Sequence, residues 1–462
     1  MDRITFLGAT GTVTGSRFQL EIDGKNVLID CGLFQGNKEN RLQNWEKFPV
    51  NPASFDHVFL THAHIDHSGY LPKFVKEGFK GDIVTTKATA ELCEVMLMDS
   101  AHLQEEDAKW ANKRGFSKHS PALPLYTKED AERVMPLLKR VHYGDFYQLT
   151  ENTRVKYHDS GHILGAALID FKTTTENGSR KIVFSGDMGR PDVPVLKDPD
   201  QVYNVDYLIL ESTYGDRLHS DADGKEELAR VINESIKRGG TLVIPAFSVG
   251  RTQTLLYLIR ILEEEGDIPV LPVYMDSPMA IEALKIFEDH IPDFDLQARM
   301  ETMGGKDIFR TGNLHLCRSK EESISINDVH KSAIIISASG MVTGGRILHH
   351  LAKRLPDPRN TVLLIGYQAE GTRGRAIQEK QETVKIHGEL VPIKAHVEML
   401  DAFSGHADYN ELLAWMMAFN KKPKKVFLVH GDEAASAAMA EHIRNKYKWD
   451  VVIPKHGESF IL

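Results

Sequence analysis

The residues best suited to chemistry in this sequence are three histidines and one aspartate within the stretch 61–67. The stretch follows an apolar run that is typical of a buried strand. His62 and His64 are two positions apart, so in extended backbone their side chains point the same way. Asp66 and His67 are expected in the following turn, within reach of a second point. Imidazole suits zinc and a carboxylate is a good bridging ligand, so we interpret the stretch as two ligands for each of two adjacent metal ions, not as a polar turn.

Two later strand ends carry further candidate ligands. His162 follows a glycine at a strand-to-strand turn, and Asp187 ends an apolar strand between glycines. A single histidine of this kind is usually structural, but two such strand ends after the first motif favour metal ligation. We expect one zinc to be held by His62, His64 and His162. We expect the second to be held by Asp66, Asp187 and a further group, with Asp187 between the ions.

Other polar residues stand where apolar strands end. Asp30 is one of them, and a buried carboxylate there would hold a metal-bound histidine in place, because such histidines usually donate their second N–H to a carboxylate. A plain strand-end turn is the alternative. Glu211 also ends a buried strand. His406 and His430 sit at element ends, from which both can face one cleft.

The glycine-rich stretch 8–15 resembles a dinucleotide-binding loop, but such a loop must open a helix. The segment that follows, 17–22, alternates as a strand, and an Asp-Gly pair then predicts a hairpin into 26–30. We therefore expect a tight loop near the metal site and no nucleotide site.

The composition indicates a globular protein with two domains or one large domain carrying insertions. The chain has 462 residues, of which 42% are hydrophobic and 26% are charged. Its three cysteines are far apart, which predicts no disulfide framework and favours a reducing cytoplasm. We expect no signal peptide and no membrane span. The net charge of −9 argues weakly against a protein that coats nucleic acid, although it does not describe the field at a cleft.

Beyond residue 212 the pattern changes to alternating helices and strands. Helices are predicted at 223–238, 251–264 and 278–289, with strands at 241–245 and 333–337 among those between and after them. Such alternation predicts a parallel sheet with helices on both faces, which forms a second domain.

Two loops of this second domain, 337–346 and 366–375, combine small residues, hydroxyls and arginines after strands. Backbone N–H groups at a helix start can bind phosphate, and arginine adds bidentate contacts. Ordinary turns between strand and helix are the alternative. The candidate substrate-binding residues are Ser337, Ser339, Arg346, Arg373 and Arg375.

Taken together, these residues resemble the motifs of the metallo-β-lactamase superfamily and, within it, of the β-CASP RNA-processing nucleases. The resemblance covers essentially the whole chain. This group includes the nuclease subunit of the pre-mRNA 3′-end cleavage machinery and compact prokaryotic relatives. The matching residues are Asp30 in the first motif, His62, His64, Asp66 and His67 in the HxHxDH motif, His162 and Asp187 in the third and fourth, and Glu211, His406 and His430 in β-CASP motifs A, B and C.

The resemblance implies an α/β fold, an αββα sandwich into which the β-CASP domain is inserted. The implied domains are 1–212 and 396–462 for the metallo-β-lactamase part and 213–395 for the β-CASP part. RNA-processing members carry histidine in motif C, whereas DNA-repair members usually carry valine, so His430 points to RNA.

The resemblance also implies a ligand set and a reaction. The first zinc would be bound by His62, His64 and His162, and the second by Asp66, His67 and His430, with Asp187 bridging. Mn²⁺ is the alternative metal. The implied enzyme is a cytoplasmic ribonuclease, endo or 5′-exo, that uses a hydroxide activated by two metals to cut single-stranded RNA, leaving 5′-phosphate and 3′-hydroxyl ends. The implied catalytic residues are Asp66, Glu211 and His406.

Three alternatives remain open at this point. A DNA nuclease of the same family and a thioester or lactam hydrolase of the superfamily would use the same ligands on another substrate. A non-catalytic scaffold would have lost metal ligands, whereas all are present here. The sequence leaves open whether the protein is a homo-oligomer and which RNA it processes.

Overall fold

The computed structural model describes residues 2–462 except 116–118, 177, 221–222, 330, 367 and 370. The contacts divide the chain into two units. Unit 1 comprises residues 1–191, 198–218 and 406–462, and unit 2 comprises residues 192–197 and 219–405. The sequence predicted domain boundaries after residues 212 and 395. These boundaries stay a prediction and differ from the division into units.

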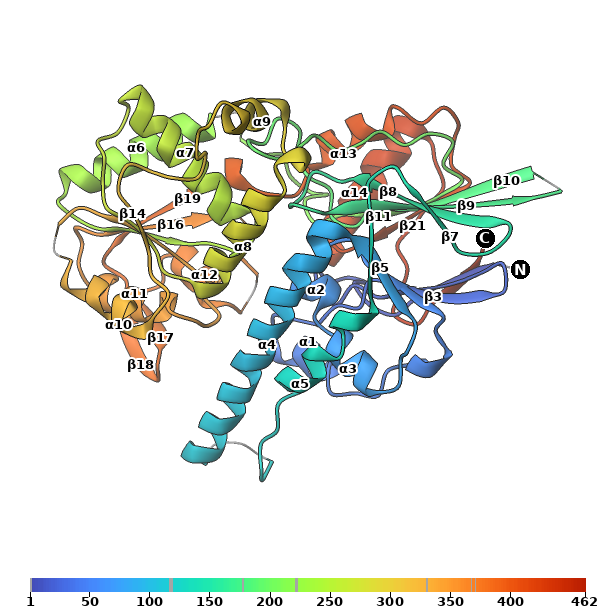
Figure 1. The fold of residues 1–462 in the computed structure, drawn as a ribbon, viewed down its shortest axis with the longest axis horizontal. Helices are drawn as coiled ribbons and strands as arrows, with labels where there is room; N and C mark the ends of the chain where they lie inside the picture. The colour runs from blue at the N-terminus through green and yellow to red at the C-terminus, as the bar shows by residue number, and fades with distance from the viewer. Residues whose placement is uncertain are drawn as a thin grey trace. The chain divides into compact units, whose positions relative to one another are not determined.

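Unit 1 is built on two seven-stranded sheets, and Figure 1 shows β7 to β10 of the second sheet side by side. The first sheet has the order β22-β1-β2-β3-β4-β5-β6 and the second the order β21-β20-β11-β10-β9-β8-β7. The strands of unit 1 are β1 (Arg3–Phe6), β2 (Phe18–Ile22), β3 (Lys25–Ile29), β4 (His57–Phe59), β5 (Asp82–Thr86), β6 (Leu138–Val141), β7 (Phe146–Gln148), β8 (Thr153–Asp159), β9 (Ala167–Thr175), β10 (Gly178–Phe184), β11 (Tyr207–Glu211), β20 (Lys425–Val429), β21 (Val451–Val452) and β22 (Ser459–Ile461).

The hydrophobic core of unit 1 lies between these sheets. Alternate residues of β8 and β9, such as Val155 and Phe171, join residues of the first sheet, such as Phe6, in one buried cluster. This alternation is what a strand with one face in the core requires. The predicted hairpin is confirmed, because β2 pairs antiparallel with β3 directly after the glycine-rich loop. That loop opens a strand and not a helix, as expected.

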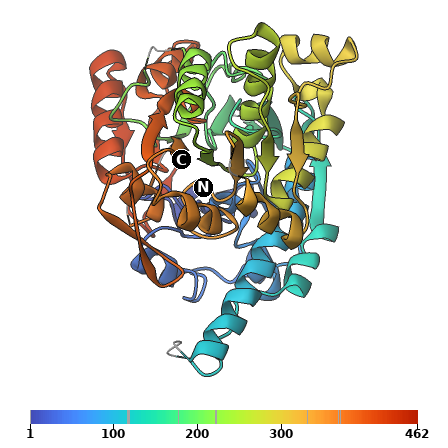
Figure 2. The ribbon, with the colours of Figure 1, turned by 90° about the vertical axis from the view of Figure 1, so that its left-hand side faces the viewer.

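Helices cover the outer faces of unit 1. Leu412 of α13 and Met439 of α14 pack against Leu208 of β11 in a second buried cluster on the outer face of the second sheet. The long helix α4 is the light-blue helix of Figures 1 and 2. The helices of unit 1 are α1 (Lys38–Gln43), α2 (Ile65–Ser68), α3 (Leu71–Lys76), α4 (Lys87–Arg114), α5 (Lys128–Glu132), α13 (Tyr409–Met416) and α14 (Glu433–Tyr447).

Unit 2 contains a six-stranded sheet of order β14-β13-β15-β12-β16-β19, in which all neighbouring strands are parallel, as the alternating pattern predicted. A two-stranded antiparallel ribbon, β17 with β18, accompanies it. The strands are β12 (Leu242–Pro245), β13 (Val273–Met275), β14 (Leu314–Leu316), β15 (Ile334–Ser337), β16 (Thr361–Ile365), β17 (Thr383–Ile386), β18 (Glu389–Pro392) and β19 (His396–Leu400).

Helices lie on both faces of the unit 2 sheet, with α6 and α7 on one side and α10 to α12 on the other in Figure 1. Ile347 and Leu351 of α11 and Ile377 of α12 pack against Val362 of β16. The helices are α6 (Gly224–Lys237), α7 (Arg251–Glu265), α8 (Pro278–Asp289), α9 (Leu296–Met303), α10 (Lys320–Ser325), α11 (Ile347–Arg354) and α12 (Arg373–Gln378).

The two ends of the chain meet in unit 1. β22 pairs antiparallel with β1, and the Leu462 N–H donates to Asp2 O at 3.0 Å. Figures 1 and 2 both show the termini close together. Among the helices in the described part of the chain, none has the length and apolar character needed to cross a membrane.

Candidate metal centre and its neighbours

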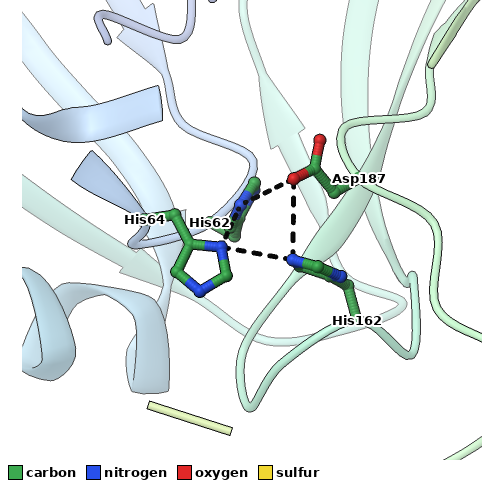
Figure 3. Close-up of side chains that lie close together, drawn as sticks. All are labelled: His62, His64, His162 and Asp187. Atoms are coloured by element: carbon green, nitrogen blue, oxygen red, sulfur yellow. Dashed lines mark hydrogen bonds and ion pairs between the residues drawn. The ribbon is translucent and has the colours of Figure 1, made fainter. Parts of the chain in front are cut away.

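Four donor atoms converge at the ends of β4, β8 and β10 in unit 1 (Figure 3). His64 Nδ1 lies 3.1 Å from His62 Nε2 and 3.2 Å from His162 Nε2. Asp187 Oδ2 lies 3.4 Å from His62 Nε2 and 3.5 Å from His162 Nε2. The structure therefore brings together the three histidines expected for the first ion with Asp187.

A second group of donors lies on the other side of Asp187. His67 Nε2 is 3.3 Å from His430 Nε2, which is 3.4 Å from Asp66 Oδ2. Asp187 Oδ1 is 3.2 Å from His67 Nε2, while its Oδ2 faces the first group. The two oxygens of one carboxylate thus point toward two different sets of ligands, which is the arrangement of a bridging ligand.

The spacing of these atoms fits a metal ion. Zinc–nitrogen bonds of about 2.0–2.1 Å in a tetrahedron place neighbouring donor atoms about 3.3 Å apart. The donor separations around His64 and around His67 lie close to that value. Imidazole and carboxylate are also the ligand types that zinc takes in catalytic sites. The residues present therefore fit a metal ion in each group.

Burial and mutual charge set the protonation of the centre. Burial lowers the pKa of His62, His64 and His162 below the ordinary imidazole value, and that of His64 to about 3. Burial alone would raise the pKa of Asp187, but the imidazoles of His430 and His67 hold it well below its usual value. Neutral imidazoles and ionised carboxylates are the forms that bind metal.

His67 differs from the other histidines of the centre. Burial alone would lower its pKa, but the carboxylates of Asp187 and Asp30 raise it well above the ordinary value. His67 Nδ1–H donates to Asp30 Oδ2 at 2.7 Å, and Asp30 is 1% exposed. A cation at His67 Nε2 would therefore take the place of a proton. Asp30 is therefore placed as expected from the sequence: it is a buried carboxylate that holds the ring of His67, a candidate ligand, in position.

Asp66 and His67, expected where a helix or turn begins after the strand, lie in the one-turn helix α2 (Ile65–Ser68). Its backbone is fixed by the loop after β3. Cys31 N–H donates to His67 O at 2.7 Å, and Ser16 N–H donates to Asp66 O at 2.9 Å. A Cβ atom on Gly32 would lie 1.6 Å from Asp66 O, so only glycine allows this approach.

A glycine also positions the histidine from the β8–β9 turn. Gly189 N–H donates to Ser160 O at 2.7 Å, and a Cβ on Gly189 would lie 2.7 Å from His162 N. The glycines that flank Asp187 in the sequence thus allow the strand end after β10 to pack directly on the turn that carries His162.

Glu211 and His406 form a pair beside the centre. His406 Nδ1–H donates to Glu211 Oε1 at 3.1 Å, and His406 Nε2 lies 4.0 Å from Asp187 Oδ2. Glu211 is fully buried and also accepts the Met188 N–H at 2.6 Å. The pairing implied by the resemblance is present, with the far ring nitrogen directed toward the metal ligands.

Comparison with known proteins identifies the family. Family models match residues 18–245 as metallo-beta-lactamase superfamily, 252–377 as Beta-Casp domain and 390–454 as Zn-dependent metallo-hydrolase RNA specificity domain. The chain is 35% identical to Ribonuclease TTHA0252 of Thermus thermophilus, over 99% of both chains. The chain belongs to the β-CASP family of the metallo-β-lactamase superfamily. It is therefore a metal-dependent hydrolase of the nuclease type, as expected from the sequence.

Other relatives of this β-CASP protein agree with that assignment. It is 31% identical to an RNase J-like protein of Methanocaldococcus jannaschii, over 98% of both chains. It is 31% identical to transcription termination factor FttA of Methanosarcina mazei, over 96% of this chain and 69% of that one. A crystal structure of a protein of unknown function from Enterococcus faecalis shares the fold, with a TM-score of 0.54 and 13% identity over the full length of both chains.

Two supporting residues of the β-CASP centre were missed in the sequence. Thr61 Oγ1 donates to Asp30 Oδ2 at 2.8 Å and lies 3.1 Å from His62 Nδ1. Thr213 Oγ1 donates to His430 O at 3.0 Å and lies 3.1 Å from its Nδ1. The only signal for these roles in the sequence was position, because Thr61 is next to a motif residue and Thr213 lies two residues beyond one. A threonine at such a position is equally compatible with an ordinary turn.

The expected phosphate-binding loops of the β-CASP domain are held mainly by internal contacts. Arg346 is ion-paired with Asp276 at 2.8 Å, and Ser337 is buried with its hydroxyl donating to Asp276 O. Arg373 Nε donates to a backbone carbonyl, and Arg375 pairs at 2.7 Å with Glu379, the residue that caps the end of the same helix.

The Ser339 hydroxyl lies 2.9 Å from Thr343 Oγ1 and accepts the Thr343 N–H at 3.0 Å, also inside the first loop. Residues 367 and 370 of the second loop lie outside the described residues. The contacts support the alternative of ordinary turns for Ser337 and Arg346, and a phosphate role for the other three residues stays a prediction.

Proposed function

We propose that this protein is a zinc-dependent ribonuclease that hydrolyses phosphodiester bonds of single-stranded RNA and leaves 5′-phosphate and 3′-hydroxyl ends. It acts in RNA processing or decay. The observation that carries the proposal is Asp187, whose two carboxylate oxygens face two separate groups of histidine and aspartate donors.

The proposed ligand set has two parts. His62, His64 and His162 hold one Zn²⁺, and Asp66, His67 and His430 hold the other, with Asp187 shared. The fit of the donor separations to zinc supports this assignment, and Mn²⁺ is the alternative metal. Two such ions supply a water of lowered pKa and Lewis acidity toward a phosphate.

The chain's own residues handle the remaining parts of the reaction. Asp66 orients the attacking water through its second carboxylate oxygen. The 3′-oxygen that leaves is a poor leaving group without a proton, and His406 Nε2 is placed to supply one because it faces the ligands from 4.0 Å. Glu211 orients His406 through Nδ1 and stabilises a positively charged ring.

RNA is favoured over DNA and over small substrates by two observations. The model of an RNA specificity domain matches residues 390–454, the segment that carries both His406 and His430. A histidine at position 430 also contributes a nitrogen ligand that a valine would not. A thioester or lactam hydrolase would need neither the inserted unit nor the Glu211–His406 pair.

The test is a gel assay with one RNA labelled at the 5′ end and, in parallel, at the 3′ end. We expect zinc- or manganese-dependent cleavage with 5′-phosphate products, and the two labels distinguish endonuclease from 5′-exonuclease activity. A DNA of the same sequence, nitrocefin and S-lactoylglutathione serve as competing substrates. Turnover of any of these without RNA cleavage contradicts the proposal.

A further inference from the structure

A pocket of about 420 Å³ lies on the second sheet of unit 1, apart from the metal centre. Its floor is formed by the residues of β8 and β9 that alternate with the core residues Val155 and Phe171. It therefore occupies the sheet face opposite the core. The residues lining it are Phe146, Arg154, Lys156, His158, Asp170, Lys172, Lys181, Asp200, Gln201, Val202 and Tyr203.

The pocket combines cations that lack a carboxylate partner with exposed aromatic rings. Within the described part of the chain, Arg154, Lys156 and Lys172 form no salt bridge. Phe146 is 54% exposed and Tyr203 is 49% exposed, and the Arg154 guanidinium and the Lys156 ammonium group lie 4.2 Å and 5.3 Å from the Phe146 ring centroid. Phosphate-binding cations beside aromatic platforms are the combination that single-stranded nucleic acid requires.

A buried acceptor at the floor of the pocket supplies a second, independent indication of a ligand. Asp170 is 4% exposed, and its Oδ2 accepts from Lys181 Nζ at 2.7 Å. Its Oδ1 makes no hydrogen bond to any residue that the structure describes, whereas its Oδ2 also lies 3.5 Å from His158 Nε2. A buried acceptor without a hydrogen-bond donor is unfavourable, so a ligand with an N–H or O–H group is favoured here.

We propose that this pocket is a second RNA-binding site, which holds one nucleotide of a single-stranded RNA outside the metal centre. Lys156, Lys172 and Arg154 contact phosphates, a base stacks against Phe146 or Tyr203, and an amino, imino or hydroxyl group of the nucleotide donates to Asp170 Oδ1. A volume of about 420 Å³ is within the range of small-ligand sites, roughly 300–1,000 Å³.

The pocket is connected to the active site through the chain itself. Asp159 N–H donates to Asp200 Oδ2 at 3.0 Å, and Asp200 N–H donates to Asp159 O at 2.8 Å. These bonds fasten the pocket wall, residues 200–203, to the end of β8, three positions before His162. RNA held there would be anchored beside the segment that carries a metal ligand. The inference rests on the proposed ribonuclease function for the identity of its ligand.

The experiment compares the double variant Lys156→Ala/Lys172→Ala with the control Lys47→Ala/Lys80→Ala, which removes two exposed lysines of the same unit and the same charge. Binding of a fluorescent 20-nucleotide RNA is measured by anisotropy in EDTA over a series of salt concentrations. We expect the pocket variant to bind about tenfold more weakly, with a salt slope flattened by about 0.7 for each lysine that contacts a phosphate. The control should match the parent protein.

A second pair of variants isolates stacking. Phe146→Ala should weaken RNA binding about fivefold or more, while Phe146→Tyr should restore it, because either aromatic ring can stack on a base. RNA containing 4-thiouridine should crosslink to peptides spanning 146–156 or 200–203 in the parent protein. The pocket assignment would be overturned if the pocket variants kept the RNA affinity of the parent protein, or if the lysine control lost as much affinity. It would also be overturned if crosslinks formed only outside these peptides, or if AMP bound the protein without weakening its binding of RNA.

Hydrolysis of bis(p-nitrophenyl) phosphate separates this inference from the proposed function. That substrate is too small to span both sites, so the pocket variants should keep its kcat and KM while raising KM on a long RNA. Loss of both activities would mean that the pocket residues only support the fold, which overturns the inference. If the parent protein cuts no RNA but the pocket variants still lose RNA affinity, the binding site stands and the nuclease proposal fails.

Discussion

Two histidines of the metal centre, His67 and His430, present one particular ring nitrogen because the other nitrogen has a fixed partner. Asp30 takes the Nδ1–H of His67, and Thr213 Oγ1, whose own hydrogen goes to a carbonyl, takes the Nδ1–H of His430. In both rings this leaves Nε2 as the lone-pair donor. Such partners are as much part of a metal site as the ligands themselves.

His430→Ala tests the second metal at the residue scale. Asp66 and His67 would remain with the shared Asp187, which gives one nitrogen ligand and two carboxylates, so we expect zinc content to fall toward one per chain and RNase activity to be largely lost. Zinc is measured by mass spectrometry after gel filtration. His442→Ala, at an α14 residue stacked on Tyr409, is the matched histidine control. Two zincs and full activity in the His430 variant would exclude it as a ligand.

His406→Ala tests the leaving-group role. The variant should keep both zincs and its RNA affinity but cut about 10²–10⁴-fold more slowly, the usual contribution of general acid catalysis. On an RNA whose leaving 3′-oxygen is replaced by sulfur, which needs no proton, most of this defect should disappear. Single-turnover rates on both substrates give the comparison. An equal defect on the sulfur substrate would make His406 a binding residue.

The sequence predicted which side chains come together better than it predicted their backbone conformation. Residue type and spacing were sufficient to expect His62, His64 and Asp187 close to one another, as the structure has them. They did not predict the backbone of Asp30 and His430, which both adopt a left-handed conformation with φ of 58° and 49°. That conformation costs a non-glycine residue about 1–2 kcal/mol, so local preference predicts against it and only the surrounding contacts hold it.

At the scale of elements, the centre depends on backbones that approach more closely than side chains allow. The loop after β3 lies against α2 at Gly32, and the segment after β10 lies against the β8–β9 turn at Gly189. The alternation of apolar and polar residues predicted strands with one face in the core, because such strands bury every second residue. The alternation of strands and helices predicted the parallel sheet of unit 2, whose strands are buried on both faces. The sequence could not decide between a helix and a turn at α2, because a single helical turn has no periodicity to detect.

Gly32→Ala tests this packing. The added methyl would lie 1.6 Å from Asp66 O and force α2 away, so we expect a loss of at least about 1–3 kcal/mol of folding free energy together with reduced zinc content. Urea unfolding and metal analysis measure the two effects. Gly344→Ala is the control, because nothing lies within 4 Å of its Cβ position. Normal stability and zinc binding in the Gly32 variant would show that α2 can shift without harm to the site.

At the scale of the whole molecule, the metal centre joins segments from both sheets of unit 1. The first sheet contributes the ends of β3 and β4, and the second contributes the ends of β8, β10, β11 and β20. Ligands that bind only the folded state stabilise it by mass action. Metal bound at this junction should therefore stabilise unit 1 as a whole.

Metal removal provides the test. Free zinc at 1,000 times its Kd is worth about 4 kcal/mol, which corresponds to a fall in Tm of about 8–16 °C when a chelator removes it. Tryptophan fluorescence reports this unit selectively, since all four tryptophans, at positions 45, 110, 415 and 449, belong to unit 1. The His430→Ala variant should show a smaller fall. Identical melting with and without chelator would mean that metal binding is not linked to folding here.

The order in which the chain is synthesised gives the position of His430 a further meaning. His67 and His430 are 363 positions apart, and the whole of unit 2 except its first short segment is translated between β11 and β20, which pair in register from Tyr207 with Lys425 to Glu211 with Val429. A ribosome therefore releases His62, His64 and His162 long before His406 and His430. Under the proposed ligand set, a chain cut short before residue 430 would lack a nitrogen ligand of the second ion, so the second metal site would be completed only after unit 2 has been translated.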